Sequence, residues 1–323
     1  DRARPWAIGT LAHHAPVLVV AASGREAEDL SAELTALLGD KVAYFPAWET
    51  LPHERLSPAP DIVGKRAQVL DLVGAGKAQV VVTSARGYCQ PILSKVEGRA
   101  PIFLKEEEEH EFSHIVSELE FRAYKHVDMV AKRGEYATRG GILDIFPTTS
   151  DYPVRIEFWG DEITDIRQFS VADQRAIQEI EVGEVAIYPA RELPITNEVA
   201  ARARDLAQKF GGNAALAELL TKVGEHIPAE GMEALLAVLA DAPFAPLPEL
   251  LPTGTHVLLV APEKIRTRIA DLESTDAEFL AAGWEAAAMG ADGPLAAEGL
   301  DTEASSYRSY ESVSYTHLRA HET

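Results

Sequence analysis

The chain is poor in cysteine, in basic residues and in long apolar runs. Its 323 residues include one cysteine, Cys89, which excludes a disulfide framework and a cysteine-based metal site and favours a reducing cytoplasm. No apolar run reaches the roughly 18 residues that a membrane-spanning helix needs. Because 30 Lys and Arg face 51 Asp and Glu, a basic nucleic-acid-coating surface is excluded as the main role of the whole chain. We therefore expect a cytoplasmic protein without a bulk affinity for nucleic acid.

The composition that remains is that of a globular protein, with 46% hydrophobic and 25% charged residues. The length suggests roughly two domains, at about 150 residues each. Charge is unevenly spread, with a net charge of 0 over 1–100, −9 over 101–182 and −12 over the remainder. This division predicts any nucleotide-like chemistry at the front and protein-facing or solvated surfaces behind it.

Short buried strands alternate with helices in the first hundred residues. The continuous apolar run 16–21 is typical of a strand buried on both faces. Ser23 and Glu26 then form a capping box, which predicts a helix that ends at Gly39. The further expected elements are a strand over 42–45, a helix over about 62–73 and a strand over 79–83. This order predicts an α/β fold with a parallel sheet.

The middle of the chain has a different pattern. The four glutamates 106–109 are expected to open an amphipathic helix that carries Ile115 and Leu119, followed by a strand over 141–146. Residues 154–169 predict a hairpin that turns at Gly160-Asp161. From about 187 the chain is alanine-rich and helical, with one more strand over 256–260 and a helix over 263–272. We therefore predict an α/β lobe interrupted by an inserted α+β domain.

Two sequence patterns suggest enzyme chemistry. Gly74-Ala75-Gly76-Lys77 is similar to the end of a phosphate-binding loop, but Asp71 replaces the leading glycine and Ala78 replaces the magnesium-binding hydroxyl residue. The segment also closes a helix and enters a strand, opposite to a phosphate cradle, so we expect no ATP site in it. The chain begins with Asp1 and not with methionine, so we expect its start to be a cut end.

The second pattern, His110-Glu111-Phe112-Ser113-His114, matches the H-E-x-x-H signature. On a helix this spacing places both histidines on one face, able to bind zinc with Glu111 as base. A zinc metallopeptidase is therefore the alternative function. The simpler interpretation is a solvated acidic helical turn, because four glutamates precede it and no third ligand follows at the usual spacing.

The predicted hairpin presents a candidate interaction face. Alternation places Val154, Ile156 and Phe158 on a core face, and it places Arg155 and Trp159 on the opposite one. Trp and Arg are enriched at protein–protein hot spots. The alternative interpretation is that Trp159 is buried against another element and that Arg155 only pairs with a carboxylate. The pattern alone favours the interaction face and this alternative equally.

Four stretches, 45–58, 133–147, 153–162 and 227–233, carry a family resemblance. In this order and spacing the chain resembles, over about 1–311, the N-terminal module of the bacterial transcription-repair coupling factors (Mfd). The middle two stretches are also similar to the excision-repair protein UvrB.

The resemblance implies a domain for each part of the chain. Residues 1–100 and 187–311 would form a RecA-like lobe of the P-loop NTPase type, degenerate in its ATP site. Residues 101–186 would be an inserted α+β domain that binds UvrA. The remaining residues, 312–323, are expected to be a non-native tail. The UvrA-contacting residues of the family, two arginines and an aromatic, correspond to Arg139, Arg155 and Trp159, with Trp where the family usually has Phe.

The resemblance also implies what this chain would not do. Relatives continue into an RNA-polymerase-binding domain, a DNA translocase driven by ATP with Mg, and an autoinhibitory C-terminal domain. None of those motifs is in this sequence. We therefore expect a non-catalytic module without a cofactor or metal, which binds UvrA and recruits nucleotide excision repair to stalled RNA polymerase.

Overall fold

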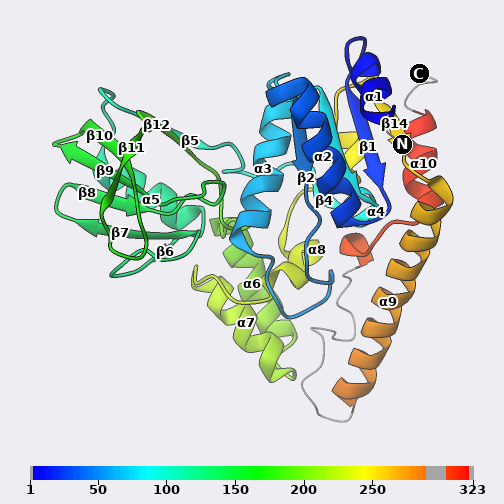
Figure 1. The fold of residues 1–323 in the computed structure, drawn as a ribbon. Coiled ribbons are helices and arrows are strands. Elements are labelled where there is room, and N and C mark those ends of the chain that lie inside the picture. Colours follow the sequence, from blue (N-terminus) through cyan, green and yellow to red (C-terminus); the bar gives the residue numbers. More distant parts are fainter. Residues whose placement is uncertain (1–2, 289–302, 320–323) are drawn as a thin grey trace. The chain divides into compact units, whose positions relative to one another are not determined.

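The computed structural model describes residues 3–288 and 303–319 and divides the chain into two compact units (Figure 1). Unit 1 comprises Asp1–Ser57, Val69–Lys95 and Asn197–Thr323, and unit 2 comprises Pro58–Gln68 and Val96–Thr196. This division differs from the expected boundaries in three ways. Residues 58–68, expected in the first part of the lobe, go with unit 2. The long segment of unit 2 also begins at residue 96 instead of 101 and continues to residue 196 instead of 186.

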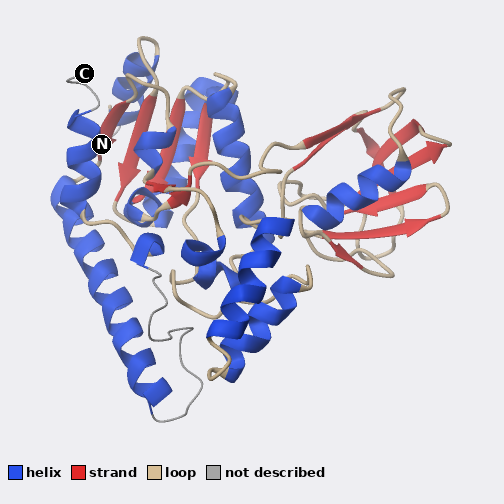
Figure 2. Cartoon of the chain, turned by 180° about the vertical axis from the view of Figure 1, so that it is seen from behind, coloured by secondary structure: helices blue, strands red, loops and turns tan. Residues whose placement is uncertain are grey.

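Unit 1 is built on a four-stranded parallel sheet in the order β14-β1-β3-β2. Helices cover both faces of this sheet (Figure 2). The strands are β1 (Val17–Ala21), β2 (Val42–Phe45), β3 (Val80–Ser84) and β14 (His256–Leu259). Every residue of β1 and β3 is buried, as the continuous apolar runs predict. The predicted parallel α/β sheet is confirmed.

The helix after β1 begins at the predicted capping box. In α2 (Gly24–Leu38) the Ser23 side chain accepts a hydrogen bond from the Glu26 amide at 3.2 Å, and the Glu26 carboxylate accepts one from the Ser23 amide at 3.3 Å. The helix ends at Gly39, which has a φ of 63°, a value that glycine adopts with little conformational strain. Its buried side chains, among them Leu30 and Leu34, pack against the sheet.

The other helices include one that is much longer than expected. The helix predicted over 263–272 continues as α9 (Pro262–Ala288). The remaining helices are α1 (Arg4–Ala12), α3 (Pro60–Gly74), α4 (Ala85–Cys89), α6 (Asn197–Lys209), α7 (Ala214–Gly224), α8 (Leu236–Leu239) and α10 (Tyr310–Arg319), and a short sheet pairs β4 (Ile92–Leu93) with β13 (Phe244–Ala245). Among the residues that the structure describes, no helix has both the length and the apolarity of a membrane span.

The glycine-rich segment after α3 is a helix stop. Helix α3 ends at Gly74, Gly76 adopts a φ of 68°, and β3 begins at Val80. The segment therefore closes a helix and enters a strand, as predicted. Cys89, at the end of α4, lies fully buried in the core, and burial raises the pKa of its thiol to about 12.

Two of the four resemblance stretches fasten to each other inside unit 1. The Ser57 hydroxyl donates to Glu233 at 2.6 Å and accepts from the Gly231 amide at 2.9 Å, while the Ser57 amide donates to Glu230 at 2.8 Å. Gly231 has a φ of 77°, and a Cβ there would lie within 2.8 Å of the Arg55 backbone. The proline-rich stretch 45–58 is thus fixed by residues 227–233, which gives both stretches a structural role.

Unit 2 contains a six-stranded sheet in the order β11-β10-β9-β8-β7-β6. All neighbours are antiparallel except β6 and β7. The strands are β6 (Lys125–His126), β7 (Glu135–Arg139), β8 (Ile142–Ile145), β9 (Val154–Trp159), β10 (Glu162–Phe169) and β11 (Ala176–Glu181), and a separate pair joins β5 (Ile102–Lys105) to β12 (Glu184–Ile187). The predicted hairpin is β9–β10, turning at Gly160-Asp161.

One face of this sheet is covered by α5 (Phe112–Phe121) and the β5–β12 pair. Ile115 and Leu119 of α5 are buried against inward residues of the sheet, including Ile156. The expectation that residues 106–109 open this helix is wrong. Glu107 has a φ of 69°, and the amides of Glu107 and Ile163 exchange hydrogen bonds with carbonyls across the two segments, so the glutamates run beside the hairpin instead.

The segment 312–323, expected to be a non-native tail, is in part packed. Val313 is 1% exposed and belongs to the core of unit 1. Residues 320–323 and, within the expected return part of the lobe, residues 289–302 lie outside the described residues.

Candidate functional site

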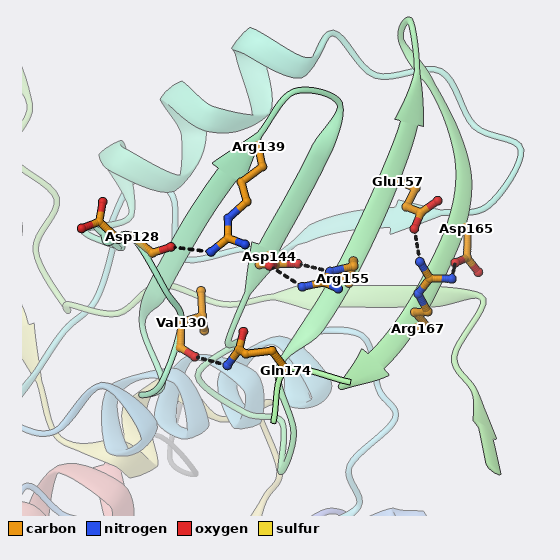
Figure 3. Close-up of polar contacts among 9 residues, drawn as sticks. All are labelled: Asp128, Val130, Arg139, Asp144, Arg155, Glu157, Asp165, Arg167 and Gln174. Carbon is orange, nitrogen blue, oxygen red and sulfur yellow. Dashed lines mark hydrogen bonds and ion pairs between the residues drawn. The ribbon is translucent and has the colours of Figure 1, made fainter. Parts of the chain in front are cut away.

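By strand alternation, the face of the six-stranded sheet opposite α5 carries all three predicted site residues, and we call it the outer face. Figure 3 shows Arg139 and Arg155 on this face. Along β9, Val154, Ile156 and Phe158 are buried in the core of unit 2, which confirms the predicted alternation. Trp159 is 81% exposed, so burial of this Trp against another element, the alternative interpretation, is wrong for this unit.

Arg155 is held by a carboxylate on the neighbouring strand. Its Nε and Nη2 donate to the two oxygens of Asp144 at 2.6 and 2.8 Å, and the two residues are direct cross-strand partners. Asp144 is only 3% exposed. The guanidinium also lies over the Phe169 ring, 5.1 Å from its centroid. The pairing with Asp144 raises the pKa of Arg155, so its charge is fixed and its orientation is set before any partner arrives.

Arg139, at the end of β7, is exposed. Its Nη2 donates to the carbonyl of Asp128 at 2.9 Å (Figure 3). In the described part of the chain no carboxylate pairs with it. It therefore keeps most of its donors available for an acceptor that comes from outside.

A third arginine, Arg167 of β10, shares this face and was not predicted. It forms ion pairs with Glu157 and, at 2.8 Å, with Asp165 (Figure 3). The register between β9 and β10 shifts between Ile163 and Asp165, so that Ile163 lies opposite Phe158 on the core side but Asp165 lies opposite Glu157 on the outer side. Simple alternation counted from Ile163 would place Arg167 in the core. In the sequence, the feature that could have indicated an exposed Arg167 is the mostly polar composition of residues 164–168.

Two loops, one with Val130 between β6 and β7 and one with Gln174 between β10 and β11, lie over the other part of the outer face. A small apolar cluster is buried there, formed by Val130, Ala137, Phe146 and Phe169. The side chain of Gln174 donates to the Val130 carbonyl at 3.3 Å and so connects the two loops (Figure 3). The outer face is thus packed on one side and exposed around Arg139 and Trp159 on the other.

The chemistry of the exposed part suits a protein surface. It offers a large flat aromatic ring, the exposed guanidinium group of Arg139 and the guanidinium group of Arg155, whose orientation is fixed by Asp144; Trp and Arg are enriched at binding hot spots. The guanidinium donors fit carboxylate oxygens or carbonyls of a partner.

The H-E-x-x-H sequence does not form the helical pair that the alternative function, a zinc metallopeptidase, would need. Helix α5 starts at Phe112, so His110 precedes it, and the His110 side chain faces Glu108 at 3.3 Å. The alternative function is therefore not supported. Over residues 3–288 and 303–319, no group of three His, Cys, Asp or Glu side chains is arranged to hold a metal ion.

A buried polar cluster in unit 1 also brings a His, an Asp and a Ser together. The Nε2 of His53 lies 2.8 Å from the Ser306 hydroxyl and 3.7 Å from Asp276. A single ring nitrogen thus faces both groups, whereas a catalytic triad uses both ring nitrogens. Burial lowers the pKa of His53 to about 4 and raises that of Asp276 to about 6; both residues are buried, and Ser306 is half-buried. The cluster is a structural one.

Comparisons with known proteins find a family of domains that matches most of unit 2. Residues 102–193 match the family model of the UvrB interaction domain. A transcription-repair-coupling factor of Mycobacterium tuberculosis is 48% identical over 300 residues, which are 89% of this chain and 24% of that protein. Those of Escherichia coli (33% over 184 residues) and Bacillus subtilis (32% over 194 residues) match 56% and 59% of this chain, and 16% of each relative.

The chain therefore spans about a quarter or less of the length of these relatives. The matches confirm the resemblance predicted from the four sequence stretches. The chain is a relative of the transcription-repair-coupling factors that contains a UvrB interaction domain.

Proposed function

We propose that this chain is a non-catalytic module that binds UvrA through the outer face of unit 2 and so recruits nucleotide excision repair. The match of residues 102–193 to the UvrB interaction domain supports the identity of the partner, and the relatives are named for coupling transcription to repair. One observation carries the location of the site, namely that Trp159 is 81% exposed on the sheet face that also carries Arg139 and Arg155.

Each site residue would have a separate role. Trp159 would supply most of the contact area, because a Trp ring buries a large apolar surface and loses little conformational freedom. Arg139 would donate to acidic side chains of UvrA. Arg155, held by Asp144 at 2.6 and 2.8 Å, would present its remaining donors in one orientation and would need no reordering on binding.

We further propose that unit 1 is a degenerate RecA-like lobe and that unit 2 is a domain inserted into it. The parallel sheet with helices on both faces and the position of residues 96–196 between segments of unit 1 support this arrangement. ATP, Mg, RNA polymerase and DNA would then be ligands of other parts of a full-length relative. Addition of ATP is expected to leave the thermal stability of this chain unchanged.

The direct test is a binding measurement with purified UvrA. Trp159→Ala is expected to weaken binding at least about 30-fold, as removal of a hot-spot Trp usually costs about 2 kcal/mol or more. Trp6→Ala is the matched control, because Trp6 is also exposed, at 66%, but lies in α1 of unit 1. Thermal unfolding of both variants should match that of the unchanged chain.

Arg139→Ala locates the site more finely. It should weaken binding about tenfold without a change in the unfolding temperature, since its side chain is exposed and makes one hydrogen bond to a backbone carbonyl. Equal affinity of the Trp159→Ala and Arg139→Ala variants and the unchanged chain would contradict the proposed site. Equal losses for Trp6→Ala and Trp159→Ala would contradict its restriction to the outer face.

A further inference from the structure

We infer that Arg167 is a positioning residue of the UvrA-binding face, which acts by neutralising Glu157; this inference rests on the proposed function. Arg167 carries no role in the resemblance described above, and its side chain is about as exposed as its two carboxylate partners, at 39% against 35% and 36%. Arg167 can thus neutralise negative charge on the outer face, although it is less exposed than Trp159.

The register of the sheet creates a problem that Arg167 solves. Glu157 lies directly opposite Asp165, and Arg155 lies directly opposite Arg167, so two pairs of like charges face each other on neighbouring strands. Like charges in this position are destabilising. Arg155 turns to Asp144 on one side, and Arg167 turns to the Glu157–Asp165 pair (Figure 3). Each like-charge pair is thereby separated by a bond to the opposite charge.

Glu157 is the carboxylate that matters for binding, because of where it lies. It stands between Arg155 and Trp159 on the same face of β9. It also shares a row of the sheet with Arg139, two strands away through Ile142, which is roughly 10 Å at about 4.8 Å per strand. An acidic group of UvrA that reaches Arg139 or Arg155 therefore approaches Glu157 as well.

Without Arg167, Glu157 would oppose binding in two ways. Its free charge would repel an acidic partner group, and like-charge contacts at interfaces are costly. It could also turn to Arg155, whose pKa its charge already helps to raise, and occupy donors that UvrA needs. Both effects reduce affinity, and both depend on the charge of Glu157.

The test is a set of substitutions measured for UvrA binding. Arg167→Ala is expected to weaken binding about threefold to tenfold, the range for one or two partly exposed charge contacts. Adding Glu157→Gln to Arg167→Ala should restore affinity to within about twofold. Adding Asp165→Asn instead is the matched control and should restore much less, because Asp165 lies one strand further from Arg139 and Trp159.

The outcomes separate the possible roles of Arg167. Unchanged affinity of the Arg167→Ala variant would overturn the inference. A loss that Glu157→Gln does not restore, or that Asp165→Asn restores equally, would also overturn it, since Arg167 would then contact UvrA directly or act through the fold. A loss with Trp159→Ala but none with Arg167→Ala would leave the proposed function intact, whereas normal binding of the Trp159→Ala variant would contradict both.

Discussion

In the parallel sheet of unit 1 every residue of β1 is buried, whereas in the antiparallel sheet of unit 2 strand β9 buries only alternate residues. The difference follows from topology. Parallel strands need crossover helices, and these cover both faces of the sheet, while antiparallel strands joined by hairpins can leave one face exposed. The exposed face of unit 2 can therefore change its side chains without loss of the core, and that face carries the candidate site.

The same contrast separates the four resemblance stretches. Residues 45–58 and 227–233 bind each other through Ser57 and Glu233 within unit 1. Residues 133–147 and 153–162 contain Arg139, Arg155 and Trp159 of the outer face. Two of the resemblance stretches thus form internal hydrogen bonds that hold unit 1 together, and the other two form the candidate site of unit 2.

The largest expected effect on stability comes from shortening a buried side chain, and it tests the two-sided burial of the parallel sheet against the one-sided burial of β9. Leu18→Ala in β1 should lower the free energy of unfolding of unit 1 by about 2–5 kcal/mol, because Leu18 is fully buried and its removal leaves a cavity. Ile156→Ala in β9 should do the same for unit 2, but Trp159→Ala should change stability by less than about 0.5 kcal/mol. Hydrogen exchange read by mass spectrometry reports each unit separately. Equal losses for Ile156→Ala and Trp159→Ala would refute the one-sided burial of β9.

The next effect tests whether the outer face is independent of stability throughout. Asp144→Ala should destabilise unit 2 by about 1–3 kcal/mol, since it leaves Arg155, which is only 21% exposed, without its bidentate acceptor. It should also weaken UvrA binding, because Arg155 loses its fixed orientation. Asp151→Ala is the control, as Asp151 is 93% exposed in its pair with Arg133 and should contribute within about 0.5 kcal/mol. Thermal unfolding of the Asp144→Ala and Asp151→Ala variants measures both effects. Equal shifts in the unfolding temperature would show that the Asp144–Arg155 pair is no more important for stability than the exposed Asp151–Arg133 pair.

The smallest expected effect concerns the buried cluster of unit 1 and its dependence on pH. Folding raises the pKa of Asp276 from 3.8 to about 6, so between these values the folded state holds more protons on it and stability falls as pH rises. Folding lowers the pKa of His53 from 6.5 to about 4, so across nearly the same range that group makes stability rise with pH. The two contributions oppose each other.

Asp276→Asn removes one of these opposing contributions. The variant should be about 1–2 kcal/mol more stable than the unchanged chain at pH 7, with the gain vanishing below about pH 4. Its stability should also rise more steeply between pH 4 and 6.5, because only His53 then titrates within the cluster. Urea unfolding at several pH values measures this, with Asp271→Asn, at an exposed position of the same helix, as control. A gain that does not depend on pH would show that charge burial is not its cause.

Much of the fold could be predicted from local sequence patterns. The buried run 16–21, the capping box at Ser23 and the hairpin turn at Gly160-Asp161 each depend on neighbouring residues alone, and each is found as predicted. The start of α5 could not be predicted, because Glu107 and Glu108 exchange backbone hydrogen bonds with Ile163 of the β9–β10 hairpin, which is distant in the sequence. Tertiary contacts there override the helical preference of glutamate.

The candidate site was partly predictable for the same reason. Strand alternation places Arg155 and Trp159 on one face because β9 is regular. Arg167 could not be placed, since the register shift after Ile163 moves the rest of β10 to the other side. The role of Asp144 also depends on a cross-strand partner that the sequence alone does not identify.

The pairing of β14 with β1 fixes the order in which the molecule can be completed during synthesis. Val17 lies beside His256 in the sheet, so β1 lacks one neighbour until the ribosome has made residues 256–259. All strands of unit 2 are made earlier, by residue 187. Unit 2 can thus finish folding while β1, entirely apolar along its length, still has an open edge, which is the kind of edge that pairs wrongly with other chains.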